Sequence, residues 1–182
     1  MVIGAARHEP EALLGHAGSQ GGPLEHVIAA KAVAFAEAAR PEFRQYAAQV
    51  VANAAALGTA LAGEGFRLVA GGTDNHLVLI DLRPFDAELT GKEAQEVLDR
   101  AGITLNRNTI PDDPRSPFVT SGLRLGTAAE TTAGMGPEEM ATIAGLIGRT
   151  LRARTDETEV AAVRADVANL CAKFPPYPDL LG

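Results

Sequence analysis

Apolar residues recur at intervals of three and four between Phe35 and Leu61, which is the spacing of one face of an α-helix. The Ala-rich residues Leu24–Ala39 predict a first helix, and Pro41 suits the first position of a second helix that runs to about Leu61. The apolar stripe consists of Phe35, Ala39, Phe43, Tyr46, Val50, Ala54, Leu57 and Leu61.

Alternating residues further along the chain predict β-strands. Residues 66–70 and 76–82 are strand-like, and a turn-rich stretch between them predicts an antiparallel hairpin. Another strand is predicted at 123–126, where the alternation places Arg124 on the face opposite to its leucine neighbours.

Three more helices are predicted. The first opens at Thr90 with the Thr-x-x-Glu pattern of a capping box and ends at Gly102, and the last is capped by Asp156. The stripes of the two C-terminal helices are Met140, Ile143, Ala144, Ile147 and Leu151, then Val160, Val163, Val167, Leu170 and Phe174.

This order of elements predicts an α+β fold, in which a long N-terminal helical segment is followed by a small mixed or antiparallel sheet covered by helices. We expect residues 1–20 to be irregular, residues 21–62 to hold a glycine turn and linking helices, and residues 63–182 to form a small C-terminal α+β domain.

Composition narrows the classes of function. The net charge of -7, without clustered Lys and Arg, argues against nucleic-acid binding. The single cysteine, Cys171, excludes an internal disulfide, and the four histidines lack the spacing of metal ligands. Neither a secretory signal nor a membrane span is recognisable, so we expect a cytoplasmic protein without a metal site.

Arg124 is the most suggestive single residue for binding. Gly122 and Gly126, two residues away on either side, leave space around its guanidinium, and a planar guanidinium can bind a carboxylate through two hydrogen bonds. An ordinary surface arginine on a strand would look the same in sequence.

Two further segments could bind ligands. The turn at Gly21 and Gly22 precedes a helix, so its backbone amides could receive a phosphate, although a plain helix-entry turn has the same pattern. Asn108 lies in a polar, proline-bounded loop and could recognise the amide edge of a heteroaromatic ring, although loop solubility would explain it equally well.

Four motifs together resemble the serine hydroxymethyltransferase family. They are QGGPLEHVIAAKAVAFAEA at 20–38, GGTDNHLVLIDLRP at 71–84, LTGKEAQEVLDRAGITLNRNTIP at 89–111 and DPRSPFVTSGLRLGT at 113–127. The resemblance covers about residues 20–177 and corresponds to the C-terminal portion of these fold-type I pyridoxal-phosphate enzymes.

The resemblance implies an enzyme that interconverts serine and glycine with tetrahydrofolate and works as a dimer or a tetramer of dimers. It also implies roles for individual residues. Arg124 takes the place of the arginine that binds the carboxylate of the amino-acid substrate. Gly21 and Gly22 match the turn that reaches the cofactor phosphate in the neighbouring subunit, and Asn108 matches an asparagine that contacts folate.

One feature of the family is not found in this sequence. The Schiff-base lysine normally lies shortly before the glycine turn, whereas the only lysines here are Lys31, Lys92 and Lys173, all in predicted helices. Because pyridoxal chemistry requires an imine lysine, we expect the chain to be inactive alone and to need a chain that bears this lysine.

Two other interpretations remain. The chain could be a noncatalytic domain that dimerises or binds a full-length paralogue, or a degenerate gene product, and self-association would then cover the apolar stripe of its N-terminal helices. Folate-independent aldol chemistry by the chain alone is disfavoured, because no group here could act as an electron sink.

Overall fold

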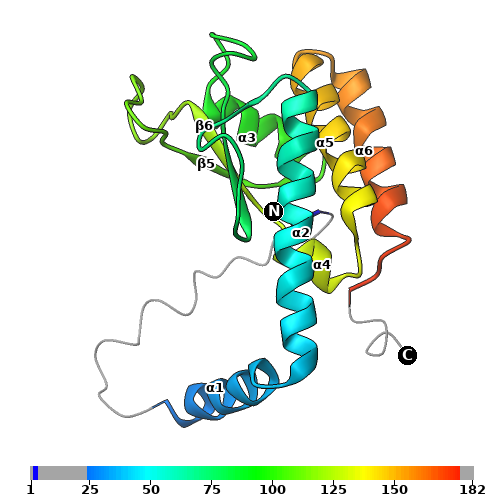
Figure 1. Cartoon of the computed structure of the whole chain (residues 1–182). Helices are drawn as coiled ribbons and strands as arrows, with labels where there is room; N and C mark the ends of the chain where they lie inside the picture. Colours follow the sequence, from blue (N-terminus) through cyan, green and yellow to red (C-terminus); the bar gives the residue numbers. More distant parts are fainter. Residues whose placement is uncertain (1, 4–23, 177–182) are drawn as a thin grey trace. The chain divides into compact units, whose positions relative to one another are not determined.

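The computed structural model describes residues 2–3 and 24–176 (Figure 1). These residues belong to two compact units. The larger unit contains Val2–Ile3 and everything described from Ala48 onward, and the smaller unit contains the described residues 24–47.

The sheet of the larger unit has four strands in the order β2-β3-β6-β5, and every neighbouring pair is antiparallel. A separate two-stranded ladder joins β1 to β4. The strands are β1 Val2–Ile3, β2 Arg67–Leu68, β3 Leu77–Asp81, β4 Ile103–Thr104, β5 Asn106–Asn108 and β6 Gly122–Gly126.

Helices cover one side of this sheet, and Figure 1 shows α3, α5 and α6 together on that side. Side chains from these helices and from the C-terminal half of α2 share one buried core with the inward-facing strand residues. The helices are α1 Glu25–Ala38, α2 Pro41–Gly63, α3 Gly91–Arg100, α4 Ala128–Thr132, α5 Pro137–Arg152 and α6 Glu157–Cys171.

The two faces of the sheet differ because side chains alternate along each strand. Val78 and Ile80 of β3 pair with Leu125 and Leu123 of β6, and all four side chains are buried against the helices. The opposite face, which we call the open face, carries the residues at the alternate positions.

The α+β architecture predicted from the sequence is confirmed. Thr90 caps α3 by accepting a hydrogen bond from the Glu93 amide, and the Asp156 side chain caps α6. The short helix α4 was not predicted, since five residues carry too little periodicity to be recognised.

The predicted boundaries at 20 and 62 remain predictions. Of the segment expected to be irregular, Val2–Ile3 forms β1, and the rest lies outside the described residues.

The smaller unit is unusually exposed. None of the residues of α1 is buried, and Val33 and Phe35 are 59% and 70% exposed. The predicted apolar stripe therefore divides: Phe35 and Phe43 lie in solvent, whereas its last four members, from Val50 onward, are buried. The N-terminal helices consequently present apolar side chains that no described residue of this unit covers.

Candidate functional site

Cross-strand pairing brings two of the predicted site residues onto the open face. Arg124 of β6 lies opposite Leu79 of β3 on one side and Asn106 of β5 on the other. Asn108 lies opposite Gly122, two residues away from Arg124 along β6. Because neighbouring strands are about 4.8 Å apart and residues two apart share a face, Arg124 and Asn108 belong to the same small surface.

Arg124 lies in a groove of about 540 Å³. The groove is lined by His76, Leu77, Thr104, Leu105, Asn106, Arg124 and Gly126, and none of these side chains is acidic. Arg124 is exposed, and within the described part of the chain no hydrogen bond or ion pair engages its guanidinium. A strand arginine with a structural role would normally have a carboxylate partner, so this side chain is available to an anionic ligand.

Asn108 is half-buried, and its side-chain amide donates a hydrogen bond of 2.6 Å to the Thr109 carbonyl. Its amide oxygen thus remains available as an acceptor. Gly21 and Gly22 lie outside the described residues, so their predicted contact with a phosphate stays a prediction.

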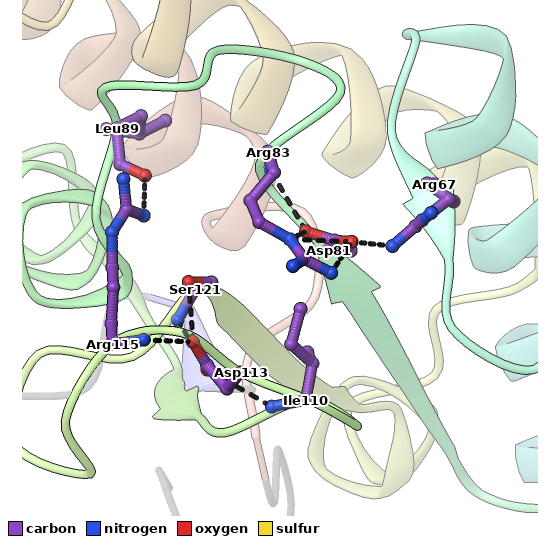
Figure 2. Close-up of polar contacts among 8 residues, drawn as sticks. All are labelled: Arg67, Asp81, Arg83, Leu89, Ile110, Asp113, Arg115 and Ser121. Carbon is purple, nitrogen blue, oxygen red and sulfur yellow. Dashed lines mark hydrogen bonds and ion pairs between the residues drawn. The ribbon is translucent and has the colours of Figure 1, made fainter.

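A buried ion cluster occupies the other end of the open face (Figure 2). The Asp81 side chain is fully buried and pairs with Arg67 of β2 and with Arg83. Burial alone would raise the pKa of Asp81, but hydrogen bonds from Arg83 and Arg67 outweigh it, and the pKa is lowered. The carboxylate is therefore charged at neutral pH and holds both guanidinium groups in place.

A second polar network fixes the loop that joins Asn108 to Arg124 along the chain (Figure 2). The Asp113 carboxylate accepts hydrogen bonds from the amides of Arg115 and Ser121, at 3.0 and 2.9 Å, and from the Ser121 hydroxyl at 2.7 Å. The Arg115 side chain donates to the Leu89 carbonyl at 2.7 Å, just before α3. The loop is thereby clamped at both of its ends.

These hydrogen bonds predict a pH-dependent contribution from Asp113. Burial alone would raise its pKa, but hydrogen bonds from Arg115 and Ser121 lower it below the ordinary value of 3.8. The stabilisation is then present above about pH 4 and is lost as the pH falls through the lowered pKa. We expect Asp113→Asn to reduce the free energy of unfolding by roughly 1–2 kcal/mol at neutral pH.

Urea denaturation at neutral and acid pH measures this effect. The neighbouring Asp112→Asn is a matched control, because Asp112 is exposed and accepts no such set of hydrogen bonds. A loss for Asp113→Asn that stayed constant down to acid pH would contradict the role given to the charged carboxylate.

Sequence reasoning missed both networks. The sequence does contain a pattern that indicates the Asp81 network. Asp81 is an isolated acid inside the apolar run LVLIDL, and Arg83 follows it by two residues. An acid at a buried strand position requires a cationic partner, so this pattern could have predicted the pair. Asp113 carried no comparable signal, because acids are common in proline-rich loops.

The described residues contain neither a candidate metal site nor a candidate membrane span. No group of three His, Cys, Asp or Glu side chains is placed to hold a metal ion in the part of the chain that the structure describes. None of the described helices is both long and apolar enough to cross a membrane.

The fold and the groove define an α+β domain that presents, on the open face of a small antiparallel sheet, an arginine that pairs with none of the described residues. The model of the family described as serine hydroxymethyltransferase matches residues 13–147. This match spans most of the 182 residues, so the chain belongs to the serine hydroxymethyltransferase family. Enzymes of this family depend on pyridoxal phosphate and act in one-carbon metabolism, and they are generally oligomeric.

The described residues do not fit an imine-bound pyridoxal phosphate by themselves. None of the three lysines lines the Arg124 groove. Lys92 lies on α3 with 56% of its side chain exposed, where it faces Glu96 at 4.0 Å, and Lys31 lies on the exposed α1. Neither Lys92 nor Lys173, the two lysines described in the larger unit, lines the groove, so neither is placed to form the imine beside Arg124.

Proposed function

We propose that residues 1–182 supply the substrate-binding side of a serine hydroxymethyltransferase site, and that the pyridoxal-phosphate lysine is supplied by a polypeptide segment outside these residues. Arg124 would bind the carboxylate of serine or glycine, Asn108 would contact tetrahydrofolate, and Gly21 and Gly22 would reach the cofactor phosphate. Bound pyridoxal phosphate would supply the electron sink for the reaction.

The observation that carries this proposal is the guanidinium of Arg124, which pairs with no described residue and lies in a groove whose described lining includes no acidic side chain. A carboxylate bound there would pair with the arginine without competition from a neighbouring Asp or Glu. The exposed His76 and Asn106 line the same groove and could position the bound amino acid through hydrogen bonds.

Reconstitution tests the proposal directly. The chain would be mixed with a lysine-bearing large domain of a serine hydroxymethyltransferase, in the presence of pyridoxal phosphate. We expect serine cleavage and a pyridoxal absorbance band that neither polypeptide gives alone. The absence of both gains would count against the proposal.

In the reconstituted assembly, Arg124→Gln should lower kcat/KM for serine by about 100-fold, since a desolvated charge-assisted pair with the substrate is lost. The thermal stability of this variant should stay close to that of the unmodified chain, because Arg124 is exposed and pairs with none of the residues that the structure describes. Arg100→Gln on α3 is the matched control and should leave kcat/KM unchanged. A large fall in the melting temperature of Arg124→Gln would show that the arginine has a structural role instead.

A noncatalytic role is the second candidate, and the exposure of α1 favours it. Ile28, Val33 and Phe35 are each more than half exposed, and no residue of this helix is buried. Apolar surface of this kind is typical of a region that associates with another copy or with a paralogue. Sedimentation of the chain over a range of concentrations tests this role, and a stable monomer at high concentration would remove its basis.

A further inference from the structure

A second groove lies at the Arg67 end of the open face. Its volume is about 350 Å³, and it is lined by Arg67, Val69, Arg83, Ile110, Pro111 and Asp112. The proposed roles of Arg124 and Asn108 do not use this groove, and none of its lining residues lines the Arg124 groove.

The buried Asp81 carboxylate holds Arg67 and Arg83 in place. Asp81 lies under them with no exposed side-chain surface, and it accepts hydrogen bonds from Nη2 of Arg67 and from Nε and Nη2 of Arg83. Each guanidinium has further N–H groups, which hydrogen-bond to no other residue in the described part of the chain. Since the arginines are already immobilised, a ligand that binds them loses little side-chain entropy of the protein.

The charges of the groove favour an anion only in its interior. Asp81 offsets one of the two positive charges beneath the groove, and the Asp113 carboxylate also acts on Arg83, so only part of the second positive charge is left uncompensated. Asp112 is exposed at the rim, and it lies close enough to Arg83 to contribute to the raised pKa of that arginine, after the larger effects of Asp81 and Asp113. Asp112 should therefore weaken anion binding, and its removal should strengthen it.

The groove continues the surface that carries Asn108. Cross-strand pairing forms one row across all four strands, which consists of Asn108, Gly122, Asp81 and Arg67. About three strand spacings of 4.8 Å therefore separate Asn108 from Arg67. Ile110, two residues after Asn108, lines the groove directly. An extended ligand that contacts Asn108 at one end could thus reach the arginines with the other.

We propose that Arg67 and Arg83 form a carboxylate-binding subsite, and that it receives the glutamate end of the folate substrate. The assignment to folate rests on the proposed function, whereas the affinity for carboxylates does not. Guanidinium forks match the planar geometry of a carboxylate, and the glutamate end of folate carries two such groups.

Nuclear magnetic resonance of the full chain tests the subsite, with the Nε–H signals of Arg67 and Arg83 as reporters. Three probes are titrated separately: glutarate as a free dicarboxylate, 5-formyltetrahydrofolate as a folate with its glutamate, and 6-methyltetrahydropterin, which has no carboxylate. We expect the first two to shift both arginine signals, the folate to bind more tightly than glutarate, and the pterin to leave both signals unchanged.

Two variants should change the affinity in opposite directions. Arg67→Gln should raise the Kd of glutarate and of the folate about tenfold, since one charge-assisted contact is lost while Arg83 still pairs with Asp81. Asp112→Asn should lower both Kd values about threefold by removing the opposing charge, and the positive φ of 54° at this position suits Asn as well as Asp. Arg100→Gln on α3 is the control, because Arg100 lines neither groove, and it should leave the Kd of glutarate unchanged.

The possible outcomes separate this inference from the proposed function. Shifts by glutarate without any tighter binding of the folate would support the carboxylate subsite and overturn the assignment to folate. No shift of either arginine signal by glutarate or the folate, or equal affinities in Arg67→Gln and the unmodified chain, would overturn the subsite itself.

Discussion

Gly122→Ala should lower the free energy of unfolding by about 3 kcal/mol, because the centre of the sheet has no room for a side chain at this position. An added Cβ would lie 2.5 Å from the Ile110 side chain and 2.8 and 2.9 Å from the backbone oxygens of Ile80 and Asn108. The two oxygens belong to the flanking chain segments, so they cannot retreat without breaking the ladders on both sides of β6.

Thermal denaturation measures this loss, and a decrease of roughly 10 °C in the melting temperature corresponds to it for a chain of this size. Gly72→Ala is the matched control, since a Cβ there would meet no atom within 4 Å. If Asn108 has the proposed contact with folate, the Gly122 variant should also bind folate less well, because the Asn108 carbonyl is one of the contacted groups. A variant as stable as the unmodified chain would contradict the packing described around Gly122.

Replacement of Glu130 should stabilise the protein at alkaline pH. Glu130 lies on α4 and is only 3% exposed, and neither carboxylate oxygen has a hydrogen-bond partner in the part of the chain that the structure describes. Burial raises the pKa of this carboxyl from 4.5 to about 7. The folded state therefore keeps the proton that the unfolded state loses above about pH 4.5, and stability falls as the pH rises through 7.

Glu130→Gln removes this ionisation and keeps the shape of the side chain. We expect the free energy of unfolding of the variant, minus that of the unmodified chain, to be about 2 kcal/mol larger at pH 8 than at roughly pH 5. This increase follows from the size of the pKa shift. Urea denaturation at the two pH values measures the change, and Glu138→Gln at an exposed position is the control. A difference between the two proteins that did not vary with pH would contradict the buried ionisation.

The secondary structure could be predicted largely from local patterns. Alternation between Leu123 and Leu125 was enough to place Arg124 on the face away from the core, and the caps at Thr90 and Asp156 marked the starts of their helices. These features depend on neighbours within four residues, which is the range over which sequence patterns are informative.

The grooves could not be predicted in the same way, because they depend on strand order. Arg67 and Asp81 become neighbours through antiparallel register, and Ile110 reaches Gly122 only because β5 pairs with β6. The register across four strands is not encoded in any one segment. The pairing of Arg67 and Arg83 with Asp81 was therefore not predicted from the sequence. Glu130 was missed for a related reason, since five residues of helix do not reveal which side is buried.

The pairing of β1 with β4 has a consequence for folding kinetics. Thr104 of β4 lines the Arg124 groove, and its partner in the ladder is Val2, which lies near the N-terminus and far in sequence from Thr104. Contacts between residues so distant in sequence are slow to form, because the loop entropy must be lost before the contact is gained. One wall of the groove is therefore expected to be completed late, after the local hairpin of β2 and β3 has formed.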